Sequence, residues 1–138
     1  MPTSLKNRIA LVTGASRGIG YATARALAKA GAHIIAVART QGGLEELDDE
    51  IRKDGGSATL VPLSLADTDG IARLGAALHE RHGKLDILVN NSGIIRDRTI
   101  KKLTTEEFES IIRVNLTGTF NVTQKAAAIL RNDGRIVN

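Results

Sequence analysis

A glycine-rich stretch near the N-terminus has the residue types and the spacing of a phosphate-binding turn. It follows the apolar run 9–12 and leads into a helix predicted over residues 21–30. Gly14 allows a tight turn out of the strand, Gly18 lets the backbone approach a phosphate, and Gly20 lets the helix pack closely. The free amides and the positive dipole end of the helix then face an anion. We therefore predict a pyrophosphate site formed by Gly14, Ser16, Arg17, Gly18, Ile19 and Gly20.

The end of the second apolar run indicates which dinucleotide would bind. Folds that use NAD place an acid about 20 residues beyond the glycine turn, on the adenosine ribose 2′-OH. Here that segment reads Val37-Ala38-Arg39 and has no acid. The planar guanidinium of Arg39 suits a 2′-phosphate, and Arg17 offers a second cation. We predict NADP(H) as the cofactor; the alternative for Arg39 is a surface arginine at a strand end.

Five apolar runs alternate with helical patterns and position these residues. Strands are predicted over residues 9–12, 33–37, 58–62, 85–89 and from 135 to 138, and helices over 21–30, 44–51, 67–82 and 105–130. Near-continuous apolar strands joined by helical crossovers favour a parallel sheet covered on both faces. Residues 1–138 are therefore expected to form one α/β domain, a doubly wound Rossmann sheet of strand order 3-2-1-4-5. Its ligand would lie between strands 1 and 4.

Composition argues against several other classes of partner. The net charge of +4 invites a nucleic-acid partner, but only three aromatic residues occur, too few for a base-stacking platform. The chain has no cysteine, and its three histidines fit strand edges and helix surfaces, so we expect no metal site. The N-terminus lacks the apolar core of a signal peptide and no run is long enough to span a bilayer. We predict a cytoplasmic protein without a membrane partner.

Taken alone, the three glycines also fit an ordinary turn, but three further motifs follow them. Asn90-Asn91-Ser92-Gly93 comes after the fourth apolar run, Val114-Asn115-Leu116-Thr117-Gly118 lies in the last helix, and Gly134-Arg135-Ile136-Val137-Asn138 is the last strand. With Gly14-x-x-x-Gly18-x-Gly20, these resemble, in order, the motifs of the short-chain dehydrogenase/reductase family. Ser92 stands where the family's second motif has alanine.

The resemblance implies roles for further residues. Asn91, Ser92 and Gly93 would line the cofactor ribose, and Asn90 would tie the fourth strand to its neighbour. Ser64 and Leu65 would meet the adenine, although the family has Asp-Val there. Asn115 would be the catalytic asparagine, which in the family holds the lysine of a proton relay through a water. The alternatives are a turn residue for Asn91 and a solvent-facing polar residue for Asn115.

The family's remaining catalytic residues, a serine and a Tyr-x-x-x-Lys pair, fall after the fifth strand, and the sequence stops at Asn138. Tyr21 does not substitute, because it opens the first helix and has Arg25 at the fourth position. We expect these residues to be the N-terminal portion of a domain whose catalytic half is absent. A chain ending at Asn138 is predicted to be inactive and to self-associate.

Residues 94–100 and 114–123 most resemble 3-oxoacyl-acyl-carrier-protein and acetoacetyl-CoA reductases. The resemblance implies an NADP(H)-dependent oxidoreductase that reduces the carbonyl of a small molecule, a 3-oxoacyl thioester, and works as a homo-oligomer, a tetramer or a dimer. Two alternatives stay open. One is a noncatalytic dinucleotide-binding module or inactive fragment, and the other is a steroid, sugar or alcohol dehydrogenase on the same scaffold.

Overall fold

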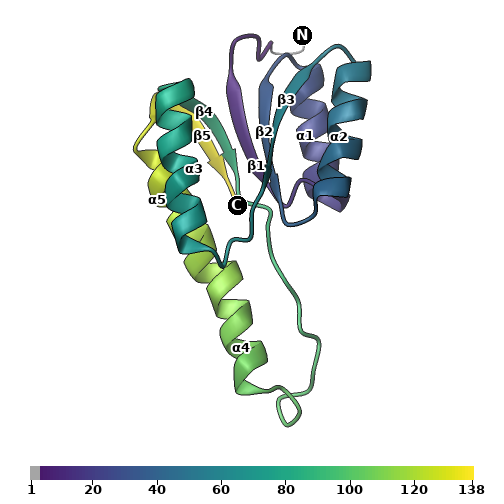
Figure 1. Ribbon diagram of the computed structural model, residues 1–138, viewed down its shortest axis with the longest axis vertical. Coiled ribbons are helices and arrows are strands. Elements are labelled where there is room, and N and C mark those ends of the chain that lie inside the picture. The colour runs from purple at the N-terminus through teal and green to yellow at the C-terminus, as the bar shows by residue number, and fades with distance from the viewer. Residues whose placement is uncertain (1–3) are drawn as a thin grey trace.

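The computed structural model describes residues 4–138 and has one five-stranded parallel sheet at its centre (Figure 1). The strands are β1 (Ile9–Thr13), β2 (His33–Ala38), β3 (Ser57–Pro62), β4 (Leu85–Val89) and β5 (Leu130–Val137). They lie in the order β3-β2-β1-β4-β5, which confirms the predicted Rossmann topology. Residues 1–3, part of the segment examined for a signal peptide, lie outside the described residues.

Helices cover both faces of the sheet. They are α1 (Gly18–Lys29), α2 (Gln41–Lys53), α3 (Thr68–Arg81), α4 (Thr105–Ile112) and α5 (Thr119–Ala127). The helices α1 and α2 pack on one face through an alanine-rich core, and α3 and α5 pack on the other face (Figure 1). Small side chains such as Ala24 and Ala28 are fully buried and bring α1 close to the sheet. Within residues 4–138, no helix is both long and apolar enough to cross a membrane.

The predicted helix over residues 105–130 is wrong in two respects. A π-helical segment, Arg113–Gly118, separates α4 from α5, and the helix ends at Ala127. Leu130 belongs to β5, where it pairs with Leu85 and packs into the core of the α3 face. The strand therefore starts five residues before Arg135, and its register shifts between Leu85 and Ile87.

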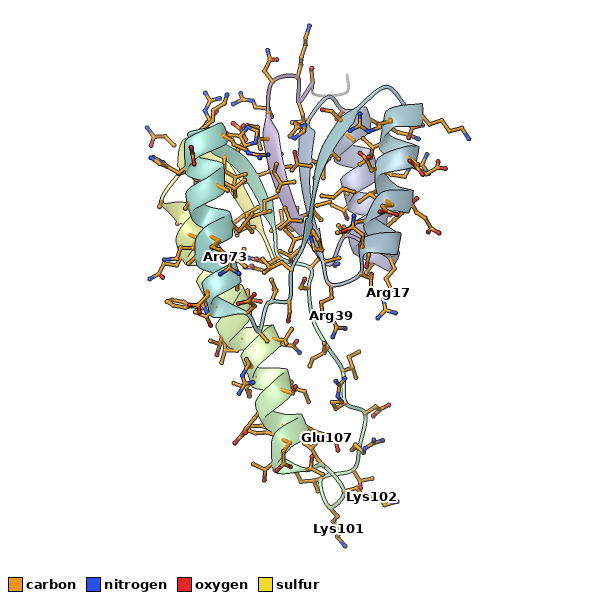
Figure 2. The ribbon with its side chains drawn as sticks, in the orientation of Figure 1. Arg17, Arg39, Arg73, Lys101, Lys102 and Glu107 are labelled. Atoms are coloured by element: carbon orange, nitrogen blue, oxygen red, sulfur yellow. The ribbon has the colours of Figure 1, made fainter. Side chains whose placement is uncertain are left out.

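A long arm projects from the carboxyl end of the sheet. Residues 93–104 have no strand or helix, and with α4 they extend away from the rest of the molecule (Figure 1). Lys101 and Lys102 lie at the tip of this arm (Figure 2). Thr104 caps α4, because its hydroxyl accepts a hydrogen bond of 3.1 Å from the Glu107 amide.

At the opposite end of the strands, near the start of β4, one buried carboxylate connects β1, β4 and β5. Asp86 in β4 accepts hydrogen bonds from the Ile9 amide at 2.8 Å, from Arg8 at 3.1 Å and from Arg131 at 3.3 Å. Burial alone would raise the pKa of Asp86, but the hydrogen bonds from Ile9 and Arg8 hold it below its usual range. The charge is therefore retained at neutral pH, and the sequence patterns did not reveal this site.

Candidate functional site

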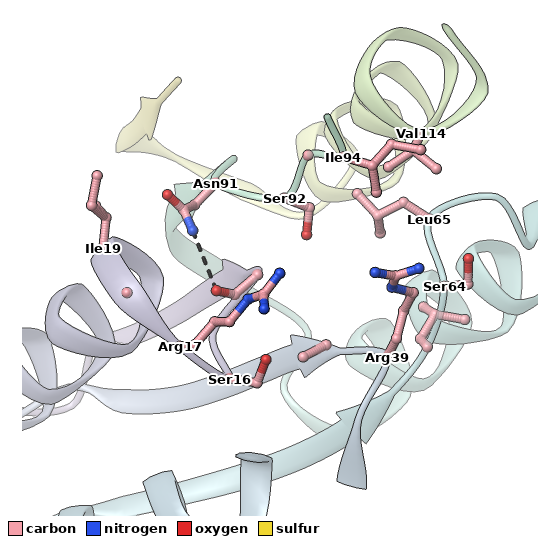
Figure 3. A pocket seen from close by; sticks show the side chains of 15 residues that line it. Ser16, Arg17, Ile19, Arg39, Ser64, Leu65, Asn91, Ser92, Ile94 and Val114 are labelled. Atoms are coloured by element: carbon pink, nitrogen blue, oxygen red, sulfur yellow. Dashed lines mark hydrogen bonds between the residues drawn. The ribbon is translucent and has the colours of Figure 1, made fainter. Parts of the chain in front are cut away.

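A cavity of about 370 Å³ opens at the carboxyl ends of β1, β2 and β4 (Figure 3). All of the predicted cofactor contacts except Gly20 line it: Gly14, Ser16, Arg17, Gly18, Ile19, Arg39, Ser64, Leu65, Asn91, Ser92 and Gly93. The structure thus brings together segments that are up to 79 positions apart in the chain. This is the switch point of the sheet, where α/β folds bind their ligands.

The glycine turn is shaped as its spacing predicts. Gly14 and Gly18 have φ values of 63° and 60°, a region that side chains disfavour. No protein atom lies within 4 Å of where a Gly18 side chain would begin, whereas a Cβ at Gly20 would overlap the carbonyl oxygen of Gly14. Gly20 therefore acts by allowing close packing and not by lining the cavity.

Helix α1 begins at Gly18, three residues earlier than predicted, so Gly18 and Gly20 lie in its first turn. Arg17, the residue before the helix, makes no side-chain cap, and the first turn contains no acid. The amides of the first turn are therefore left for a partner other than a side chain. An anion in the cavity would satisfy them and would meet the positive end of the helix dipole.

A buried hydroxyl connects the glycine turn to the fourth strand. Thr13 Oγ1 accepts hydrogen bonds of 3.0 Å from the amides of both Asn91 and Ser92, and it donates to the Val89 carbonyl at 3.4 Å. Thr13 is fully buried. The sequence patterns did not reveal Thr13, although a hydroxyl that ends an otherwise apolar strand just before the glycine turn is a usable signal.

We expect Thr13→Val to weaken dinucleotide binding, because two partly buried amides would lose their acceptor. A fully buried amide left unsatisfied costs about 1–3 kcal/mol, and these two partly buried amides together should destabilise the cavity wall by a similar amount. Thr13→Ser retains the hydroxyl and should stay close to wild type. Thermal denaturation and cofactor titration of both variants test this, and equal behaviour of valine and serine would contradict it.

The two asparagines after β4 make different contacts. Asn91 Nδ2 donates to the Gly14 carbonyl at 3.3 Å, as the dashed line in Figure 3 shows. Asn90 Nδ2 donates to Thr123 Oγ1 and to Asn138 Oδ1, both at 3.0 Å. Asn90 therefore ties β4 to α5 and to the end of β5, as predicted. The contact of Asn91 fixes the turn on which the cavity depends.

Asn115 lies in the π-helical segment and outside the cavity lining. Its side chain clamps the backbone of Ile94, accepting from the amide at 2.8 Å and donating to the carbonyl at 2.9 Å. A π turn within a longer helix often marks a functional site. The side chain is thus engaged by the loop after β4, and its catalytic role remains a prediction.

Apolar side chains that the sequence did not predict also line the cavity. The structure adds Leu63, Ile94, Val114 and Ala38 to the lining. Each of them is adjacent in sequence to a predicted site residue, and this adjacency could have indicated that they line the cavity. The hydroxyl of Ser64 accepts a hydrogen bond from the Ala66 amide at 3.2 Å.

The charge of the cavity is positive. Arg17 and Arg39 extend toward the same space from the glycine turn and from the end of β2 (Figure 3). No acid lines the cavity, and among residues 4–138 neither guanidinium forms an ion pair. The described residues also contain no cluster of three or more metal-ligating side chains. A doubly anionic group is the ligand that this arrangement fits.

Comparison with known proteins agrees with this geometry. A family model described as short chain dehydrogenase matches residues 8–138. The chain is 37% identical over 139 residues to a 3-oxoacyl-[acyl-carrier-protein] reductase of Synechocystis, covering 99% of this chain and 56% of the relative. It is also 37% identical over 135 residues to a 2,3-dihydro-2,3-dihydroxybenzoate dehydrogenase of Bacillus subtilis, covering 96% of this chain and 52% of that relative.

Solved structures show that the similarity also holds for the fold. A metagenomic short-chain oxidoreductase in complex with NADP superposes with a TM-score of 0.87 at 35% identity, covering 91% of this chain and 57% of that one. The chain spans about half the length of the curated relatives that it matches. Both the family match and the superposition cover nearly all of the described residues, and the chain belongs to the short-chain dehydrogenase family.

Proposed function

We propose that the complete protein binds NADP(H) in this cavity and reduces the carbonyl group of a small molecule. The observation that carries the proposal is the pair Arg17 and Arg39, which share one cavity without a neutralising acid. An NAD site would place an acid on the ribose 2′-OH, whereas two guanidinium groups suit a 2′-phosphate. The proposal is also supported by the similar metagenomic short-chain oxidoreductase, whose structure is a complex with NADP.

The described residues fit such a group. The amides of Gly18 and Ile19 in the first turn of α1 would hold the pyrophosphate, and the open space at Gly18 leaves room for it. Leu65 and Val114 would pack against the adenine. When bound, NADPH supplies a hydride. Asn115 would keep Ile94 and the loop after Gly93 in place beside the ribose, which is a positioning role.

For the substrate we propose a 3-oxoacyl thioester, supported by the Synechocystis relative and by the sequence of residues 94–100 and 114–123. The second candidate is a noncatalytic dinucleotide-binding module. Its support is that the described residues around the cavity account for dinucleotide binding. Turnover of acetoacetyl-CoA with NADPH by the complete protein distinguishes the two.

We further propose that the complete protein is a cytoplasmic homo-oligomer. Support for association comes from apolar side chains along α4 and the segments after it: Phe108, Leu116 and Phe120 are 53%, 64% and 60% exposed. Apolar surface of this extent is typical of an interface. The absence of cysteine is compatible with a reducing compartment.

We expect Arg39→Ala to reduce NADPH affinity by about ten- to hundredfold, since a charge-assisted hydrogen bond contributes about 1.5–3 kcal/mol. NADH, which lacks the 2′-phosphate, should bind the variant and the wild type alike. Fluorescence titration of both cofactors measures this. Arg96→Ala, in the loop outside the cavity, is the matched control. Equal affinity of the wild type for NADPH and NADH would refute the assignment.

A further inference from the structure

A second cavity of about 350 Å³ lies between the edge strand β3 and helix α3. It is nearly as large as the cofactor cavity and falls within the range of small-molecule sites. On this face of the sheet, Val61 and Leu63 are only half-buried, and both line the cavity beside α3. The fold therefore leaves an apolar groove along β3.

The groove has an apolar floor and a cationic wall. Ile35, Leu74 and Leu78, all buried in the core of this face, form the floor with the side chains from β3. Arg73 and Arg81 line the same groove from α3. With Ala77 between them, these residues recur every four positions and share one helix face. At 1.5 Å per residue, the two arginines are about 12 Å apart along the helix axis.

The two ends of the groove differ in charge balance. Arg73 lies 3.7 Å from Asp67 and is partly neutralised by it. Arg81 has no carboxylate partner in the described part of the chain, and no acid lines the groove. His82 also lines this end, and its ring lies 5.8 Å from that of His33. Burial, and then the charges of His82 and Arg52, lower the pKa of His33, which agrees with a positive potential here.

We propose that this groove binds a straight-chain alkyl carboxylate of medium length. Its carboxylate lies against Arg81 and His82, and its tail runs along Leu78 and Leu74 toward Leu63. Covering the half-buried side chains of Val61 and Leu63 supplies the affinity, and the unneutralised guanidinium selects an anion. Leu63 also lines the cofactor cavity, so the end of the tail lies close to the adenine side of that cavity.

The site is tested with decanoate on the complete protein, with decanol as the neutral probe of the same length. We expect decanoate to bind about tenfold more tightly than decanol. Alanine-methyl NMR locates the ligand, because Ala77 reports on the groove and Ala38 on the cofactor cavity. A shift of the Ala77 methyl signal supports the proposal. A shift of Ala38 alone, or equal binding of decanol, overturns it.

Substitutions on α3 provide the second test. Ala77→Leu fills the groove from an exposed position and should weaken decanoate binding more than tenfold, while Ala76→Leu on the same exposed helix surface should have no effect. Arg81→Gln should weaken binding about tenfold. Calorimetry measures each affinity, and equal binding by the two leucine variants would overturn the proposal. None of these positions lines the cofactor cavity, so NADPH binding tests the proposed function separately.

Discussion

A Gly20→Ala variant is expected to bind NADPH at least a hundredfold more weakly than the wild type and to be less stable by about 1–3 kcal/mol. The added methyl group would overlap the carbonyl oxygen of Gly14, a backbone atom that has to shift. The Gly14 carbonyl accepts from Asn91, so the shift reaches the far wall of the cavity. In catalysis, a displacement of about 1 Å in a positioned site can lower the rate about a hundredfold, and we expect a comparable loss of NADPH affinity here.

Substitutions at two other glycines distinguish the effect of backbone strain on stability from the effect of a blocked ligand site on binding. Gly42→Ala lies in the first turn of α2, where no atom would meet the new methyl, and alanine should stabilise the helix by up to about 1 kcal/mol. Gly18→Val adds a branched side chain in open space at a φ of 60°, at a cost of about 1–2 kcal/mol. It should remain folded and lose NADPH binding, because the side chain occupies the pyrophosphate space.

Fluorescence titration with NADPH and thermal denaturation measure both effects. Wild-type affinity in Gly18→Val would show that the pyrophosphate lies elsewhere. A Gly20→Ala variant as stable as Gly42→Ala would show that the turn adapts to the methyl group.

The second large effect concerns turnover. We expect a polypeptide of residues 1–138 to show no reduction of acetoacetyl-CoA above background, even when saturated with NADPH. Hydride transfer to a carbonyl leaves an alkoxide, and a positioned proton donor typically contributes about 10²–10⁴-fold. Among the described residues, no tyrosine or lysine lines the cavity. Tyr21 packs against the alanine-rich core of the α1 face and is not available.

The same polypeptide is expected to self-associate. In β5, Ile136 and Val137 are 40% and 52% exposed, and the apolar side chains of Phe108 and Phe120 are also exposed. Open strand edges and apolar helix faces favour association. Light scattering measures the mass, and Phe108→Ser with Phe120→Ser should shift it toward the monomer. A stable wild-type monomer, or measurable turnover, would contradict this pair of predictions.

The parts of the fold that were predictable depend on local patterns. The four strands β1–β4 were predictable because each is a short, mostly apolar run, and parallel crossovers then limit the possible strand orders. The π-helical segment was not found, because one extra residue in a turn barely alters the spacing of apolar side chains. The early start of β5 was not predictable, because Leu130 also fits the apolar spacing of the preceding helix. Its pairing with Leu85 is visible only in the structure.

The candidate site shows the same division. Glycine spacing and the Ala38-Arg39 pair predicted residues that the structure gathers around one cavity. The contacts between distant segments were not predictable, because a sequence gives no partner for a polar side chain. Examples are Thr13 with the amide of Ser92, and Asn115 with the backbone of Ile94.

The carboxylate of Asp86 also bears on how the chain folds during synthesis. Ile9 and Arg8 leave the ribosome before Asp86, and Arg131 follows 45 residues later. When β4 docks beside β1, its carboxylate thus finds two donors that are already present, so it is never buried without a partner. The nascent sheet can therefore grow outward from β1 in the order of translation, and Arg131 joins the carboxylate only when β5 is added beside β4.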